Sequence, residues 1–323
     1  MSRSSYDMGD IKPVRFDVLG KGETFREFIK DLLLRIGLTE DHLLILFSDT
    51  NRDKNFNEFA KCFITRSADA MYNYEMYELT GDTCLNKAVV MYFFKVLQSV
   101  QERKRLKEES EGRTFRPDVR LVDYFNKLKA LYISTKIYSD IAKRIGFGEF
   151  IQMGPRDVRD EMDAILEDSF EAFFGCFEII VDRYIQPHYS HHYVSNFINY
   201  IFGSRHINYN PDLLYDYITL LKETNDATDR GFTNPETREF RAGYKHEVHF
   251  DVASESLVAY YVMDRKKTRI PEIAPIFNKS KPSQTIMAKR VLEYLKRHPE
   301  RFATQQIRTA PTLEELGLEE LAK

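Results

Sequence analysis

Five carboxylates stand in two short segments of the sequence, at spacings that place them on helix faces. In the first segment Glu75, Glu78 and Asp82 follow one another at i, i+3 and i+7. At 100° per residue, three such side chains fall within about 60° of one another around a helix. In the second segment Asp168 and Glu171 form an i, i+3 pair. The spacing therefore predicts two helices that each carry an acidic face.

The second acidic pair lies in a segment, residues 164–177, that is otherwise apolar almost all round. Such a helix is normally buried, and acids within it are costly unless they pair with a base or bind a metal. No Lys or Arg is interleaved with the acids in either segment. If the two faces meet, their repulsion calls for divalent cations. An ion pair with a distant base, or a solvent-exposed acidic stripe, stays open as an alternative.

The donor types narrow the choice of metal and of chemistry. Carboxylate oxygens without His or Cys favour Mg²⁺, with Mn²⁺ as a substitute, over zinc. Metal pairs held by carboxylates are common in enzymes that hydrolyse phosphodiesters. The residues alone thus predict metal-assisted phosphodiester chemistry, and they do not name a substrate.

The elements that must position these acids are helical. Apolar residues recur at helical spacing through most of residues 24–203, with little strand-like alternation. Beyond residues 204–212 the pattern changes to a helix, β-like runs and a closing helix that begins at Pro. We place these at residues 213–224, 245–252, 257–263 and 282–297. The predicted fold class is mainly α: an all-helical domain followed by a small α-β-β-β-α domain.

The net charge is distributed unevenly along the chain. The 323 residues include 47 Lys and Arg against 50 Asp and Glu, a formal net charge of −3, and nucleic-acid-binding proteins usually carry a basic excess instead. However, residues 265–308 hold twelve basic and only three acidic residues. The overall charge is an average over unlike segments, so it does not exclude an RNA-binding function.

Other sequence features suggest a reducing compartment and no membrane span. No apolar run approaches the roughly 20 residues that cross a bilayer, and residues 1–10 contain no apolar stretch typical of a signal peptide. Three cysteines are an odd number without a zinc-binding pattern. We expect reduced thiols in an intracellular protein of the cytoplasm, with a nuclear or organellar location left open, and no membrane partner.

The two acidic segments resemble the signature of the ribonuclease III family. Residues 74–83 (YEMYELTGDT) are similar to the family pattern NExLEFLGDA, and residues 165–176 (ILEDSFEAFFGC) to ILADxFEAxxGA. Further similar segments lie at residues 63–67, 128–134, 141–148 and 151–155, so the resemblance covers residues 25–185 or so. Four positions depart from the family pattern: Thr65 for His, Tyr74 for Asn, Thr80 for Leu and Glu167 for Ala.

This resemblance implies a metal-dependent endoribonuclease that cleaves double-stranded RNA to 5′-phosphate and 3′-hydroxyl ends. It also implies a homodimer formed through the nuclease domain, with Mg²⁺ as the cofactor. The metal-binding and catalytic residues would be Glu78, Asp82, Asp168 and Glu171. Glu75 would be an auxiliary acid near the dimer seam and the substrate.

The second half resembles a divergent double-stranded-RNA-binding domain. Residues 216–223 are similar to its first helix, and residues 243–252 (GYKHEVHFDV) to GPxHxxxFxV with Tyr in place of Pro. Residues 279–284 and 287–292 are similar to its closing motifs SKKxAE and AAxxAL. The resemblance implies that four side chains contact RNA: His246, Lys279, Lys281 and Lys289.

The predicted organisation is an N-terminal extension (1–24), a nuclease domain (25–205), an RNA-binding-like domain (206–300) and a C-terminal tail (301–323). Two other functions stay open. One is a non-catalytic RNA-binding scaffold on the same fold. The chain retains all four presumed metal ligands, which argues against this function. The other is a nuclease whose C-terminal domain contacts protein instead of RNA.

Overall fold

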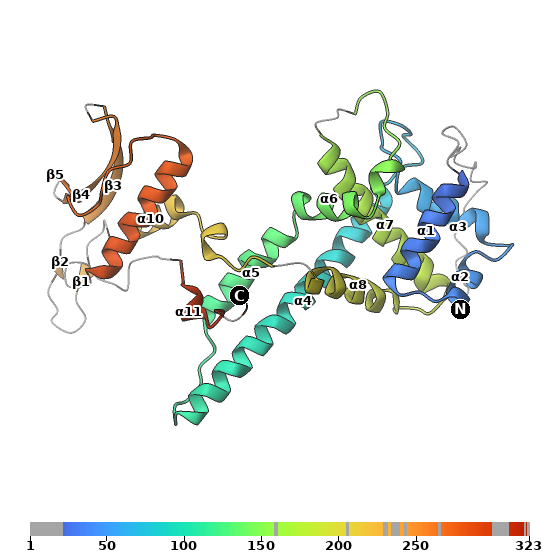
Figure 1. The fold of residues 1–323 in the computed structure, drawn as a ribbon, viewed down its shortest axis with the longest axis horizontal. Coiled ribbons are helices and arrows are strands. Elements are labelled where there is room, and N and C mark those ends of the chain that lie inside the picture. Colours follow the sequence, from blue (N-terminus) through green and yellow to red (C-terminus); the bar gives the residue numbers. More distant parts are fainter. Residues whose placement is uncertain are drawn as a thin grey trace. The chain divides into compact units, whose positions relative to one another are not determined.

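The chain divides into two compact units, Met1–Ile207 and Asn208–Lys323, and Figure 1 shows the elements of each. Most of the predicted N-terminal extension and part of the predicted tail, residues 301–309, lie outside the part of the chain that is described. The computed structural model describes residues 22–157, 161–204, 207–228, 232–233, 240–241, 244–252, 254–263, 266–298, 310–319 and 321.

The first unit is helical, as the apolar spacing predicts. An isolated parallel bridge between Ile64 and Gln152 is its one extended pairing within the described residues. Its eight α-helices over that range are α1 (Gly22–Ile36), α2 (Glu40–Leu46), α3 (Arg52–Lys61), α4 (Glu75–Ser110), α5 (Val119–Tyr132), α6 (Thr135–Arg144), α7 (Met162–Tyr184) and α8 (Ser190–Ser204), with a short 3₁₀ turn η2 (Phe147–Glu149).

Helix α7 forms the centre of the first unit because apolar residues cover nearly its whole circumference. Thirteen of its residues are buried, from Ile165 to Val181, and α4 and α6 pack against it most extensively. Phenylalanines fill the space around it in tilted and edge-to-face contacts, which aromatic rings favour. The ring centroids of Phe63 and Phe147, for example, lie 4.8 Å apart, and those of Phe170 and Phe174 lie 5.0 Å apart.

The crossing of α4 and α7 is unusually close because each helix has a glycine there. A Cβ on Gly81 would lie 1.7 Å from the carbonyl oxygen of Glu171, and a Cβ on Gly175 would lie 2.0 Å from that of Tyr77. No real Cβ tolerates such distances, so both positions require glycine. The two glycines thus permit the close approach of α4 and α7.

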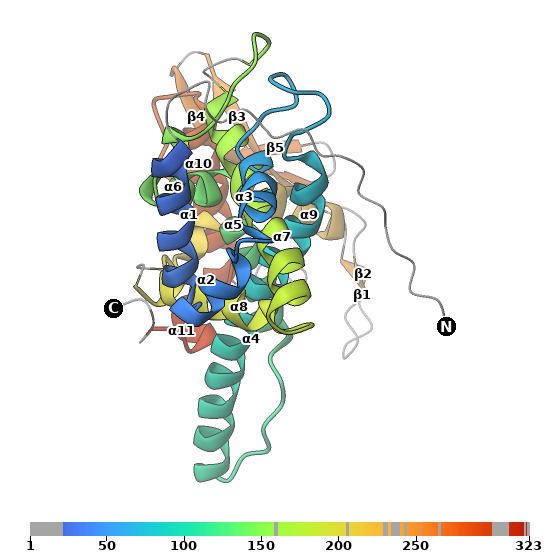
Figure 2. The ribbon, with the colours of Figure 1, turned by 90° about the vertical axis from the view of Figure 1, so that its right-hand side faces the viewer.

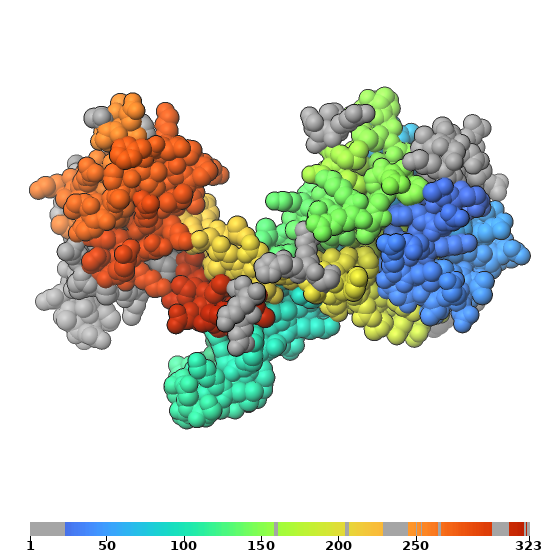
Figure 3. Space-filling view, viewed as in Figure 1, coloured from blue at the N-terminus to red at the C-terminus, as the bar shows by residue number. Residues whose placement is uncertain are grey.

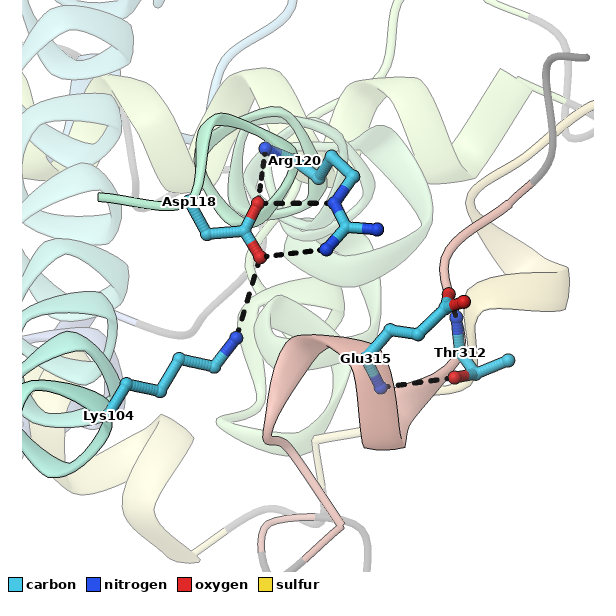
Figure 4. Close-up of polar contacts among 5 residues, drawn as sticks. All are labelled: Lys104, Asp118, Arg120, Thr312 and Glu315. Atoms are coloured by element: carbon cyan, nitrogen blue, oxygen red, sulfur yellow. Dashed lines mark hydrogen bonds and ion pairs between the residues drawn. The ribbon is translucent and has the colours of Figure 1, made fainter. Parts of the chain in front are cut away.

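Helix α4 continues well past the helices that it packs against. In both views its last turns extend beyond α7 and α8 (Figures 1 and 2), and Figure 3 shows this end standing out from the surface. The chain returns along it into α5, whose first turn is capped by Asp118. This carboxylate accepts a hydrogen bond from the Arg120 amide at 3.0 Å and lies 3.5 Å from the Lys104 ammonium (Figure 4). The last turns of α4, residues 101–110, are rich in charged side chains and form a solvated helix end.

The second unit has an α-β-β-β-α core. A three-stranded antiparallel sheet in the order β3-β4-β5 lies between two helices in the sequence, with Val248 opposite Ala259 in the register. Ile276 adds an antiparallel bridge to Leu257. The elements are η4 (Pro211–Leu213), α9 (Tyr217–Thr228), β1 (Phe232–Thr233), β2 (Phe240–Arg241), β3 (Tyr244–Asp251), β4 (Ser256–Met263), β5 (Lys266–Arg269), α10 (Lys281–Arg297) and α11 (Leu313–Leu316).

Apolar side chains of α9, β4 and α10 form the core of this unit, among them Leu221, Ala259 and Val291. Ser280 caps α10, with Pro282 in its first turn. Thr312 and Glu315 form a reciprocal capping box at the start of α11, also drawn in Figure 4. The mainly α fold class, with its small antiparallel sheet, is thereby confirmed.

One predicted boundary is wrong. The first helix of this unit begins at Tyr217 and ends at Thr228, four residues later at each end than the predicted 213–224. The cause lies at Asp216, whose carboxylate accepts hydrogen bonds from the Ile218 amide and the Thr219 hydroxyl and so acts as the N-cap. Among the described helices, none combines the length and the apolar character that a bilayer span requires.

The close helix crossing makes Gly175→Ala a destabilising substitution. Because the added methyl would meet backbone rather than a movable side chain, we expect the free energy of unfolding to fall by about 3 kcal/mol. Gly203→Ala in α8 is the matched control, since nothing lies within 4 Å of its Cβ position and alanine favours helix. Urea unfolding measures both; equal midpoints would contradict the tight crossing.

Candidate functional site

Three of the predicted ligands converge where α4 crosses α7. Glu78 comes from the first turn of α4, and Asp168 and Glu171 come from α7. One oxygen of each carboxylate lies within 4.8 Å of the others. Glu171 is only 8% exposed, and Glu78 and Asp168 are half-buried. The helix crossing thus brings together carboxylates that lie about ninety residues apart in the sequence.

The other two predicted site residues lie at the margin of this group. Asp82 stands one turn further along α4, where its Oδ1 accepts a hydrogen bond from the Asn86 side-chain amide at 2.7 Å. Glu75 is exposed and pairs with Arg66 at 3.1 Å. Within the part of the chain that the structure describes, Glu75 therefore differs from the other four acids in having a basic partner. We use the name acidic cluster for the four remaining residues: Glu78, Asp82, Asp168 and Glu171.

Burial and the neighbouring acids raise the pKa values of the two glutamates of the acidic cluster. Desolvation is the main cause that raises the pKa of Glu171 to about 8, and the charges of Asp82 and Glu167 add to it. Desolvation, followed by the charge of Asp168, likewise raises the pKa of Glu78 to about 7. Within the described residues no Lys, Arg or His forms an ion pair with the cluster. Protons or added cations must therefore balance its charge near neutral pH.

Neutral side chains are the hydrogen-bond donors around the cluster. The Tyr74 hydroxyl lies beside Asp168 and opposes the rise in the pKa of Asp168 that desolvation causes. Asn86 donates to Asp82 and accepts from the Tyr138 hydroxyl at 3.5 Å. These residues were missed by the sequence reasoning, although Asn86 carries a readable signal: it follows Asp82 at i+4, a spacing that lets helix side chains meet.

The donor set fits a hard divalent cation. All the donors are carboxylate oxygens, and neither His nor Cys belongs to the group. Oxygen-only sets suit Mg²⁺ and Mn²⁺. A cation would also offset the desolvation and the repulsion that raise the pKa values of Glu78 and Glu171. The described residues do not show the alternative arrangement, in which each acid pairs with a distant base.

The predicted RNA-contacting residues of the second unit differ in their exposure and in their partners. Lys279 and Lys281 are exposed at the start of α10. Lys289 pairs with Asp212 at 2.6 Å, and its ammonium lies 5.3 Å from the centre of the Tyr217 ring. His246 is a correction: it lies in β3, is 1% exposed, and burial lowers its pKa to about 4. A neutral imidazole inside the unit cannot reach an RNA phosphate.

Comparisons with known proteins find similarity to ribonuclease 3. The chain is 26% identical over 166 residues to a protein of Invertebrate iridescent virus 6 that is provisionally named ribonuclease 3, covering 51% of this chain and 50% of that one. It is 27% identical over 187 residues to the ribonuclease 3 of Fusobacterium nucleatum, covering 57% and 68%. The chain is thus similar in sequence to proteins named ribonuclease 3. No family model matches it.

A second viral relative of ribonuclease III type comes from Frog virus 3, at 30% identity over 173 residues, covering 52% of this chain and 41% of that protein. The chain thus spans about half the length, or less, of the two viral relatives. The nuclease domain of ribonuclease III from Campylobacter jejuni aligns with 52% of this chain and 97% of its own length, at 21% identity. Its TM-score of 0.34 is too low to support an argument.

The raised pKa values predict how stability depends on pH without metal. Between pH 4.5 and the raised values, the folded protein binds more protons than the unfolded chain, so the free energy of unfolding falls as pH rises. From pH 5 to 8.5 in EDTA we expect a loss on the order of 2 kcal/mol. Urea unfolding at several pH values measures it.

Glu171→Gln should flatten this pH dependence, because it removes the group with the pKa of about 8. Glu27→Gln, at an exposed position of α1, should leave the dependence as in the parent protein. Equal pH dependence in all three proteins would show that the acidic cluster is not strained by repulsion.

Proposed function

We propose that this protein is a divalent-metal-dependent endoribonuclease that hydrolyses double-stranded RNA to 5′-phosphate and 3′-hydroxyl ends. The observation that carries the proposal is the convergence of Glu78, Asp168 and Glu171, without a basic partner among the described residues, in a chain related to ribonuclease III. Repulsion among these acids lowers the stability of the fold. A site for Mg²⁺ or Mn²⁺ explains why the chain keeps this arrangement.

In this proposal the acidic cluster holds the metal. A bound divalent cation supplies Lewis-acid stabilisation of the phosphate charge and lowers the pKa of a bound water. The chain contributes a fixed set of oxygen donors and a partly buried setting in which electrostatic effects are stronger than in water. The tight contacts at Gly81 and Gly175 resist the separation of α4 and α7, so the carboxylates stay close before any cation arrives.

Glu75 and Arg66 belong to the substrate side of the site. Both are exposed, and their ion pair lies one turn from Glu78 along α4. An exposed guanidinium next to a phosphodiester-cleaving centre suits a backbone phosphate. We assign to this pair the orientation of RNA near the acidic cluster, with Glu75 as the auxiliary acid.

The second unit is proposed to contact the same RNA. Its basic residues cluster in residues 265–308, and Lys279 and Lys281 are exposed at the N-terminus of α10, where the helix dipole also favours a phosphate. Its α-β-β-β-α order agrees with the resemblance to a double-stranded-RNA-binding domain. Such domains recognise the shape of A-form RNA across its minor grooves.

A homodimer is proposed through the apolar side chains beside the acidic cluster. Met71, Met76 and Leu79 are 73–83% exposed, and Met76 and Leu79 lie on the same two turns of α4 as the acids. Large apolar side chains that gather on a surface mark interaction sites. A two-fold axis there would place two acidic clusters near one duplex, so that each cuts one strand.

The alternative is a non-catalytic RNA-binding scaffold on the same fold. A scaffold has no need to retain four mutually repelling acids, whereas this chain places them around one helix crossing. Metal binding separates the two functions, because a scaffold without a cofactor would bind neither Mg²⁺ nor Mn²⁺ at the acidic cluster.

Glu171→Gln should abolish cleavage by removing one charged ligand. With Mg²⁺ and long double-stranded RNA, we expect the rate to fall more than about 100-fold, since even indirect partners of metal ligands cost 10–100-fold. EDTA should abolish cleavage by the parent protein, and added Mn²⁺ should restore cleavage. Gel electrophoresis of end-labelled RNA measures the rate, and full activity in this variant would overturn the assignment.

The matched control is Glu178→Gln, which makes the same substitution on α7 about 10 Å further along the helix axis. It should cleave as the parent does. RNA binding, measured by gel shift, should persist in Glu171→Gln. Changing Lys279 and Lys281 together to Ala should weaken binding and reduce its dependence on salt; an unchanged salt dependence would favour a protein-contacting second unit.

The dimer proposal predicts the effect of Met76→Gln combined with Leu79→Gln. A two-fold interface would bury these apolar side chains from both protomers. We therefore expect the dimer dissociation constant to rise at least about tenfold. Sedimentation velocity measures it. Leu44→Gln with Ile45→Gln, at exposed apolar positions of α2, is the control and should leave the dimer intact. A monomeric parent protein would overturn the proposal.

A further inference from the structure

The two aspartates of the acidic cluster are held differently from its two glutamates. The Tyr74 hydroxyl lies beside Asp168 and opposes the rise in its pKa that desolvation causes, and Asp82 accepts a hydrogen bond from the Asn86 side-chain amide at 2.7 Å. Within the described residues no hydrogen bond reaches Glu78 or Glu171, whose pKa values reflect desolvation and neighbouring charges alone. The shorter acids are thus fixed from outside the cluster, and the longer acids are left to adjust.

Tyr74 is held in place by burial and by a backbone hydrogen bond. The residue is 8% exposed, and its backbone amide donates to the Ile64 carbonyl at 3.1 Å. This bond ties the residue before α4 to the segment after α3, so the phenol approaches Asp168 from a fixed base. Tyr74 also departs from the Asn of the family pattern, which means that the hydroxyl is a feature of this chain's own sequence.

Asn86 is anchored through a second tyrosine. Its side-chain oxygen accepts from the Tyr138 hydroxyl at 3.5 Å, and Tyr138 is fully buried on α6. This contact orients the amide, so that its nitrogen faces Asp82. A chain of neutral groups therefore runs from α6 through α4 to the margin of the acidic cluster.

Neutral donors suit carboxylates that must bind a cation. An Arg or Lys in either place would neutralise the aspartate and compete with the metal for it. A phenol or an amide restricts the carboxylate by one hydrogen bond and leaves its negative charge available. Partners of this kind, one step outside the ligands, commonly raise metal affinity because they orient the ligand and reduce the entropy lost on binding.

We propose that Tyr74 and Asn86 are positioning residues that hold Asp168 and Asp82 in the orientation that binds the divalent cation. The inference rests on the proposed function, because it presupposes that the acidic cluster binds metal. It goes further by naming two residues that touch neither metal nor RNA and by assigning each to one aspartate.

Calorimetric titration of the full chain with Mn²⁺ tests the proposal. Tyr74→Phe removes one hydroxyl and Asn86→Ala removes the amide, and each should weaken Mn²⁺ binding about tenfold. The Mn²⁺ concentration for half-maximal cleavage should rise by a similar factor, while the rate at saturating Mn²⁺ stays within about threefold of the parent. A merely structural role would lower the rate or the melting temperature without moving the metal dependence.

Tyr72→Phe and Asn196→Ala are the matched controls, since both residues lie outside the cluster, in the preceding loop and on α8. They should bind Mn²⁺ as the parent does. Parent-like affinity in both Tyr74→Phe and Asn86→Ala would overturn the inference and leave the proposed function standing. Tighter binding in Asn86→Ala would overturn it too, by showing that Asn86 holds Asp82 away from the metal. A parent protein that binds no Mn²⁺ overturns both.

Discussion

The close crossing of α4 and α7 is the constraint on which the rest of this structure depends. Backbone meets backbone at Gly81 and Gly175, and at that separation the acids that flank the two glycines cannot avoid one another. Packing energy from a helix that is buried almost all round holds the crossing closed against their repulsion. Desolvation, and after it the charges of the neighbouring acids, raises the pKa values of Glu78 and Glu171. A rigid apolar core thus maintains a charge arrangement that isolated helices would not adopt.

The environment of each acid accounts for the different roles proposed for them. Glu75 is exposed and has a basic partner, so it suits the substrate side. Glu171 is buried and has no basic partner among the described residues, so it suits a cation. The aspartates are short and are oriented by neutral groups, whereas the glutamates have an extra rotatable bond and no such restraint. One helix crossing therefore supplies both fixed and adjustable oxygen donors, which is useful to a site that must bind and release charged species.

The helical first unit and its acidic faces follow directly from residue spacing. Apolar periodicity predicts the helices because a buried stripe must recur every 3.6 residues, and the i, i+3, i+7 spacing predicts a shared face for Glu75, Glu78 and Asp82. The positions at which helices begin and end were less predictable. The first helix of the second unit starts late because the Asp216 side chain caps it, an interaction that the apolar pattern does not register. His246 was assigned to RNA by motif, yet the strand alternation places it inside, where its neighbours exclude solvent.

By itself, the sequence determined which acids share a helix face, that no base is interleaved with them, and that small residues stand beside them. Only the tertiary structure decided that Glu78 meets Asp168 and Glu171, that Asp82 stands at the margin, and that Glu75 pairs with Arg66. It also revealed the Tyr74 hydroxyl beside Asp168 and the hydrogen bond from Asn86 to Asp82. The physical reason is that spacing along one helix is local geometry. Contacts between helices depend on the packing of the whole core, which brings together residues that are distant in the chain.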